Sequence, residues 1–128
     1  MKQKSLREQR KDDVYACYLQ TLRELTARNP KTLIRDVVNA VSHKPAPRIY
    51  TDKNLIVRNV SLMRRGEIPC RCKNKQKMYE YICREVENYK GPHKHLIDIV
   101  EEIAARPAPS FFITNWNIYR IIYEKLKE

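Results

Sequence analysis

The side chains best suited to chemistry in this sequence are cations, and they gather in two short stretches. Residues 1–11 carry five cations against Glu8, and residues 64–77 carry six against Glu67. The rest of the chain adds only +2 to the formal net charge of +11. Dense positive charge on short segments is typical of polyanion binding, although solvated surfaces can also carry it. The two stretches therefore indicate contact with nucleic acid.

A third group of candidates lies on the predicted helix between these stretches. Residues 53–65 offer amide and guanidinium groups, which can hydrogen-bond to phosphates and to base edges. Duplex DNA is the expected partner. The predicted nucleic-acid-binding residues from all three places are Lys2, Lys4, Arg7, Arg10, Lys11, Lys53, Asn54, Arg58, Arg64, Arg65, Arg71, Lys73, Lys75 and Lys77.

Cysteine and histidine are the other candidates for chemistry. Cys70 and Cys72 precede His93 and His95, and two thiolates with two imidazoles could bind zinc tetrahedrally. The Cys-x-Cys and His-x-His spacings are tighter than those of common zinc fingers, so free thiols in a reducing compartment are the favoured interpretation. No cofactor and no metal site are predicted, and zinc stays open as the alternative for these four residues.

No pattern of a known catalytic site occurs in the sequence. A glycine-rich phosphate loop and an HExxH motif are both missing. Glu101 and Glu102 fall opposite the apolar positions of a predicted helix, so they are expected to face solvent. We therefore expect a protein that is not an enzyme.

The apolar segments are short. None approaches the roughly 18 residues of a membrane span, and the first residues have no apolar core of a secretory signal. A cytoplasmic protein without membrane contact is expected.

Helices must position the candidate residues. The chain has only 2 glycines and 32% charged residues, which disfavours turn-rich sheets and favours helices. Asp52 and Thr114 stand where they can cap two of these helices. Apolar residues at helical spacing, interrupted at prolines, predict an all-α fold with helices over about residues 13–27, 32–42, 53–65, 78–89, 94–105 and 115–127.

The predicted helices fall into two similar halves. Pro-Ala-Pro occurs at residues 45–47 and again at 107–109. A shift of 62 aligns residues 30–63 with 92–125 without gaps, and upstream the match continues at a shift of 64. We therefore predict a tandem duplication of a three-helix unit, with an extended Pro-Ala-Pro segment before the third helix of each copy.

Two bulky residues follow shortly after each Pro-Ala-Pro segment. They are Ile49 and Tyr50 in the first half, and Phe111 and Phe112 in the second. We expect the second pair to contribute at least one buried ring to its helical unit. An exposed aromatic surface that docks a partner is the alternative.

Four parts make up the predicted chain: a basic arm (1–12), a first three-helix repeat (13–65), a basic linker (66–77) and a second three-helix repeat (78–128). Three short helices have the frame of a helix-turn-helix unit, although the connector of about nine residues is long. The favoured function is a small basic nucleic-acid-binding protein built from two helix-turn-helix-like units. A helical protein-interaction or structural module is the alternative, in which the second repeat binds a protein partner.

The motif "PAPRIYTD" at residues 45–52 also carries a resemblance. Together with the helix after it, the motif is similar to a Pro-Ala-Pro-Arg-aromatic-Tyr pattern of small uncharacterised helical proteins from gut bacteria and their phages or mobile elements. In those proteins the pattern also precedes a helix and sometimes occurs twice. The second occurrence departs from it, because Ser110 stands in place of the arginine. The resemblance implies a phage or mobile-element context and no particular activity.

Overall fold

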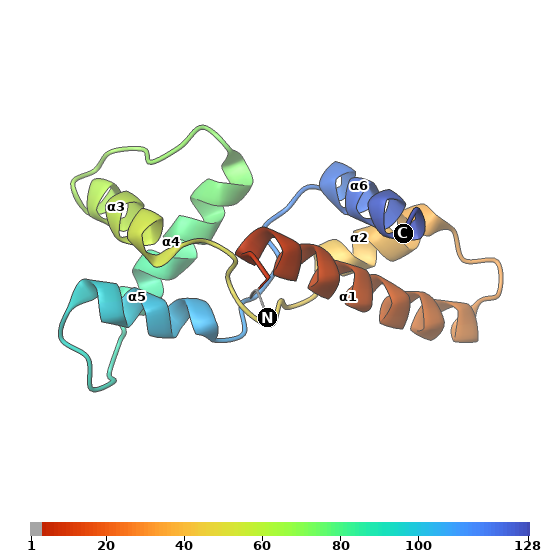
Figure 1. Cartoon of the computed structure of the whole chain (residues 1–128), viewed down its shortest axis with the longest axis horizontal. Coiled ribbons are helices and arrows are strands. Elements are labelled where there is room, and N and C mark those ends of the chain that lie inside the picture. Colours follow the sequence, from red (N-terminus) through yellow and green to blue (C-terminus); the bar gives the residue numbers. More distant parts are fainter. Residues whose placement is uncertain (1–3) are drawn as a thin grey trace. The chain divides into compact units, whose positions relative to one another are not determined.

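A computed structural model describes residues 4–128 (Figure 1). Within this range the chain forms six helices and no strand, which confirms the predicted all-α class. None of the helices in these residues has both the length and the apolar character that crossing a membrane requires. The helices are α1 (Leu6–Arg28), α2 (Ile34–Ser42), α3 (Lys53–Arg64), α4 (Lys73–Glu87), α5 (Leu96–Ala105) and α6 (Asn115–Leu126).

The helices assemble into two compact units. Unit 1 comprises Met1–Ala46 and Pro109–Glu128, and unit 2 comprises Pro47–Ala108. In unit 1, α1, α2 and α6 each pack against the other two helices, and in unit 2 the same holds for α3, α4 and α5. The units therefore do not coincide with the predicted ranges 13–65 and 78–128. Each unit takes its third helix from the other half of the sequence.

The Pro-Ala-Pro connectors give a physical reason for this arrangement. In each connector one proline stands on each side of the alanine, and together they hold the backbone extended. The chain therefore leaves the preceding helix without turning back on it. The central alanines, Ala46 and Ala108, are buried. In unit 2 the backbone N–H of Ile49 donates to the carbonyl of Ala104 at 2.9 Å, which fixes the first connector's exit against the end of α5.

Each unit has its own apolar core. The core positions recur three or four residues apart, so one stripe of each helix faces the other two. In unit 1 the buried side chains are Val14, Tyr18, Thr21, Val37, Val38, Val41, Ala46, Phe111, Ile118, Ile121 and Ile122. In unit 2 they are Ile49, Ile56, Asn59, Val60, Met78, Tyr79, Ile82, Val86, Val100, Ile103, Ala104 and Ala108.

Side-chain caps start three of the helices. Asp52 accepts a hydrogen bond from the backbone N–H of Asn54 at 2.9 Å, and Thr114 accepts one from Asn117 at 3.2 Å. Both predicted caps are thus confirmed. A third cap was not predicted: Ser5 accepts a hydrogen bond from the N–H of Glu8 at 3.1 Å and begins α1.

Two helices begin earlier than predicted. α1 starts at Leu6 and not near residue 13, and α4 starts at Lys73 and not near residue 78. The added turns are almost wholly polar, so the apolar spacing that revealed the rest of each helix could not reveal them. Most cations of the predicted arm therefore lie on α1. Three of those from the predicted linker lie on α4, so all of these groups are held at helical spacing.

The residues after the second Pro-Ala-Pro segment adopt a tight conformation. Phe111 is buried in unit 1, which confirms the expected buried ring. Phe112 is half-buried and has φ 54°, a left-handed backbone conformation that is costly for a large side chain. Its N–H donates to the hydroxyl of Ser110 at 3.0 Å. The turn thereby directs Phe111 inward immediately before α6 begins.

Candidate nucleic-acid interface

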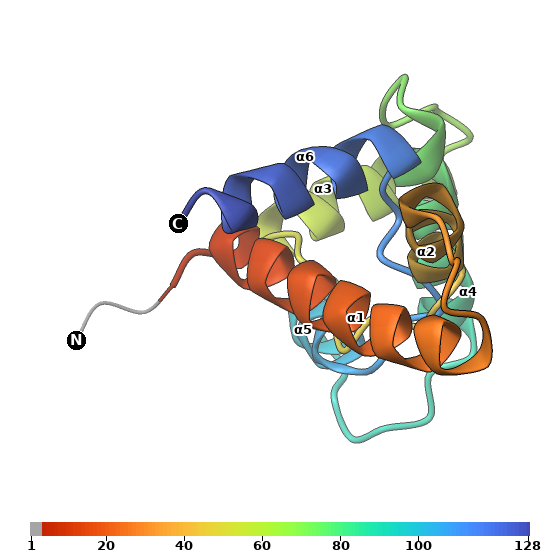
Figure 2. The ribbon, with the colours of Figure 1, turned by 90° about the vertical axis from the view of Figure 1, so that its right-hand side faces the viewer.

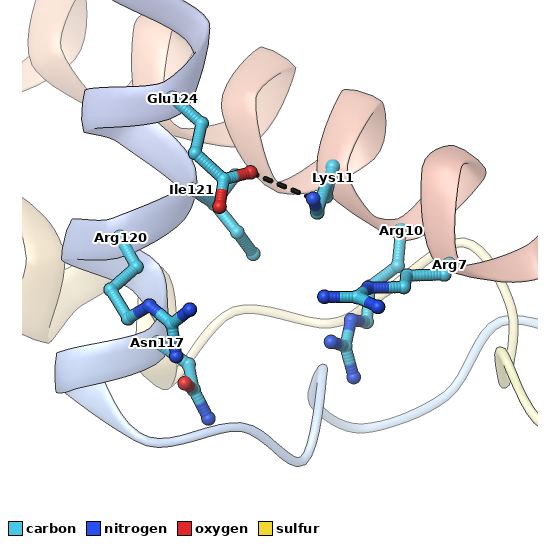
Figure 3. Close-up of a pocket in the computed structure, with 7 residues that line it drawn as sticks. All are labelled: Arg7, Arg10, Lys11, Asn117, Arg120, Ile121 and Glu124. Atoms are coloured by element: carbon cyan, nitrogen blue, oxygen red, sulfur yellow. Dashed lines mark ion pairs between the residues drawn. The ribbon is translucent and has the colours of Figure 1, made fainter.

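A cationic pocket lies between α1 and α6, which run side by side in unit 1 (Figure 2). The unit 1 pocket has a volume of about 50 Å³. Figure 3 shows the side chains of Arg7 and Arg10 from α1 facing the same opening as Arg120 and Asn117 from α6. Its full lining is Arg7, Arg10, Lys11, Asn117, Arg120, Ile121 and Glu124.

Helical spacing brings these side chains together. Arg7, Arg10 and Lys11 are three and four residues apart, so they share one face of α1. On α6, the positions of Asn117 and Arg120 are three residues apart and also share a face. Buried residues on the adjoining stripes hold the two helices against each other. The pocket therefore combines cations that are more than 100 residues apart in the sequence.

Ion pairs neutralise the lysines beside the pocket. Lys11 pairs with Glu124 at 2.7 Å, and this contact lowers the pKa of Glu124. Lys4 pairs with Asp12 at 2.5 Å, and Lys125 also pairs with Asp12. No ion pair joins Arg7 or Arg120 to another residue in the range 4–128. The guanidinium groups of Arg7 and Arg120, rather than the lysines, are thus available to meet an anion.

Replacing Asp12 with asparagine should reduce the pH dependence of unfolding. Hydrogen bonds from Lys125 first, and then from Lys4, hold the pKa of Asp12 below its ordinary value. The stability gained from a lowered carboxyl pKa is present above the unfolded pKa and lost as the pH falls through the folded one. The substitution should cost no more than about 1 kcal/mol near neutral pH, because the pair is partly exposed.

Urea unfolding of the wild type and of Asp12→Asn between about pH 7 and pH 2 measures this effect. The difference in unfolding free energy should shrink towards acid pH. Lys125→Gln serves as the partner in a double-mutant cycle, and the two substitutions should be less than additive. Additive costs with parallel pH profiles would contradict a coupled pair.

A second pocket lies in unit 2 between α3 and α4. It has a volume of about 330 Å³ and mixes apolar walls with two cations, Arg58 and Lys75. Burial raises the pKa of Tyr79 in its wall, and a hydrogen bond from Asn59 acts in the opposite direction. The unit 2 pocket is lined by Leu55, Arg58, Asn59, Leu62, Pro69, Cys70, Lys75 and Tyr79.

The predicted binding residues are divided between the two units. In unit 1, Arg7, Arg10 and Lys11 line the pocket, Lys4 is paired with Asp12, and Lys2 lies outside the described residues. Arg120 and Asn117 were missed, because nothing local in the sequence links α6 to α1.

In unit 2 the predicted residues do not form one site. Arg58 and Lys75 line the pocket. Lys53 pairs with Glu101 at 2.6 Å, and Arg65 pairs with Glu67 at 3.5 Å. The other predicted residues of unit 2, which are exposed and form no ion pair in the described part of the chain, are Asn54, Arg64, Arg71, Lys73 and Lys77.

Cys70, Cys72, His93 and His95, the four residues of the alternative zinc site, do not form a group placed to bind a metal ion. Across residues 4–128, no group of three or more histidine, cysteine or acidic side chains is placed to hold a metal ion. Cys72 and His95 each stand immediately before a helix, α4 and α5 respectively, and both are exposed. All four cysteines of the chain are free thiols.

The unit 1 pocket has the chemistry of an anion site. Guanidinium groups bind phosphate and carboxylate oxygens through two parallel hydrogen bonds and stay charged at any physiological pH. Asn117 adds a neutral amide that can donate to the same anion. Comparison with protein families, with curated proteins and with solved structures finds no match to this chain.

Proposed function

We propose that this chain is a small nucleic-acid-binding protein, without enzymatic activity, that contacts the phosphate backbone of duplex DNA. The observation that carries the proposal is the convergence of Arg7, Arg10 and Arg120 on one opening in unit 1. Like charges that line one pocket repel one another, and an anion bound between them reduces that repulsion. A phosphate group fits the site because guanidinium groups can each offer it two N–H donors.

The remaining charge supports a polyanion rather than a single small anion. The chain has a net charge of +11, and a single phosphate would neutralise little of it. In unit 2, Arg64, Arg71, Lys73 and Lys77 are exposed and add further cations that could contact phosphates. A nucleic acid offers phosphates at regular intervals, so it can satisfy many such contacts together.

The proposal includes a tandem duplication whose copies exchange their third helices. The two pockets support it, because the sequence shifts of 62 and 64 residues relate their linings. The shift of 62 relates Arg58 to Arg120, and the shift of 64 relates Lys11 to Lys75. The binding unit is then a three-helix bundle completed by the other copy, not a helix-turn-helix made from consecutive helices.

Binding to a random-sequence duplex, measured by fluorescence anisotropy over a range of salt concentrations, tests this function. The logarithm of the association constant should fall linearly with the logarithm of salt concentration. Three phosphate contacts in the unit 1 pocket alone would give a slope of about −2.7, and further contacts would steepen it.

Poly-glutamate of equal charge is the matched control, because it is a polyanion without phosphates. It should compete weakly against the duplex. Equal competition by poly-glutamate would show a nonspecific cation surface. Failure to bind duplex or single-stranded nucleic acid at about 50 mM salt would exclude the proposed function.

A further inference from the structure

The unit 2 pocket differs from its counterpart by having apolar walls. Leu55 and Leu62, seven residues apart on α3, stand where the duplication proposed above places Asn117 and Glu124 on α6. Leu55 is 46% exposed although it is a large apolar side chain. Pro69 extends the apolar wall beyond the end of α3. Aliphatic surface left open to water in a concave site favours an apolar ligand group.

Two cations, Arg58 and Lys75, stand beside this apolar surface. Arg58 and Lys75 are both exposed, and neither forms an ion pair within residues 4–128. In unit 1 the equivalent lysine, Lys11, is neutralised by Glu124. Leucine at position 62 removes that possibility for Lys75. The unit 2 pocket is therefore complementary to a ligand that carries an apolar group and a negative charge close together.

A nucleobase is a poor candidate for this pocket. Proteins that bind bases without sequence preference stack them on exposed aromatic faces. The only aromatic residue of the lining is Tyr79, which is just 2% exposed and hydrogen-bonded to Asn59. Aliphatic walls with a cationic rim instead match a peptide that has large aliphatic residues next to acidic ones.

We propose that the unit 2 pocket docks an acidic, amphipathic segment of a protein partner. An aliphatic side chain of the partner enters between Leu55 and Leu62, and an adjacent carboxylate pairs with Arg58 or Lys75. The pocket volume of about 330 Å³ suffices for such an anchor. This site lies in a different unit from the phosphate site and takes a different class of ligand, so either can fail without the other.

A fluorescein-labelled peptide with leucines at helical spacing separated by aspartate and glutamate is the probe. Two matched peptides replace either the leucines with serine or the acids with their amides. Only the parent peptide should bind the full chain with a saturable anisotropy change, and each altered peptide should bind at least tenfold more weakly. Equal binding of the three peptides, or binding of none, would overturn the proposal.

Variants then locate the binding. Leu55→Asn with Leu62→Glu installs the residues of the unit 1 pocket, and it should weaken peptide binding at least tenfold. Ile97→Asn alters another exposed apolar residue of unit 2 and should change nothing. If the double variant unfolds, the variant with Arg58→Gln and Lys75→Gln is tested in its place, because both side chains are exposed. Unchanged peptide binding by that variant contradicts the proposal.

Competition with single-stranded DNA tests the other class of ligand. If the DNA displaces the peptide from the wild type, and the variant with Arg58→Gln and Lys75→Gln loses that displacement, the pocket would be assigned to nucleic acid instead.

Discussion

Replacing all three of Arg7, Arg10 and Arg120 by glutamine should make duplex binding less dependent on salt. The slope of the logarithm of the association constant against the logarithm of salt concentration should become less steep by up to about 2.7. Each guanidinium that contacts a phosphate releases about 0.9 counterion from B-DNA, and the variant loses all three contacts. Between 50 and 200 mM salt the variant should lose roughly 40-fold less affinity than the wild type does. Anisotropy titrations of the two proteins at matched salt concentrations measure this difference.

A control variant must separate the effect of lower net charge from the effect of removing arginines at the pocket. Arg23, Arg28 and Arg35 are exposed arginines of unit 1 outside the pocket, and replacing them with glutamine removes the same charge. This control should change the slope much less. Equal slopes for the two triple variants would mean that affinity follows net charge alone. The pocket would then have no special part in phosphate binding.

Replacing Phe111 with alanine should lower the free energy of unfolding of unit 1 by about 3–5 kcal/mol. The ring is 5% exposed, so truncation removes buried apolar surface and leaves a cavity beside α6. Tyr123 on α6 is 61% exposed, and Tyr123→Ala should stay within about 0.5 kcal/mol of the wild type.

Urea unfolding followed by circular dichroism measures this loss. Trp116, the single tryptophan of the chain, lies on α6 and is 71% exposed, so its fluorescence adds only a weak signal from unit 1. Circular dichroism records both units together and shows whether they unfold in one transition or two. Unchanged stability of the Phe111 variant would mean that this ring contributes nothing to the core.

Local signals predicted the helices well where apolar residues recur at regular spacing. The starts of α3 and α6 were found because Asp52 and Thr114 are strong capping residues placed before clear stripes. The first turns of α1 and α4 were missed because polar residues carry no periodic signal. Most cations of the predicted basic arm and basic linker are therefore held on helices, where their relative positions are fixed.

The packing of α6 with α1 and α2, and of α3 with α4 and α5, could not be read from the sequence. Apolar stripes on α3 specify that the helix packs against two others, but the stripes on α1 and α2 resemble those on α4 and α5. Packing of α3 against either pair would therefore bury a similar apolar area. The same ambiguity hid the unit 1 pocket, because joining Arg7 to Arg120 requires knowing that α6 packs on α1.

Unit 2 occupies a continuous segment between the two parts of unit 1, so during synthesis unit 2 can be completed before unit 1. All of unit 2 leaves the ribosome before α6 does, whereas α1 and α2 must wait for α6. Closing a flexible loop of roughly 60 residues would cost unit 1 about 4 kcal/mol of entropy, apart from a constant. The hydrogen bond between Ile49 and Ala104 already holds the two ends of unit 2 together. Early folding of unit 2 thus closes that loop in advance and lowers the entropic barrier to completing unit 1.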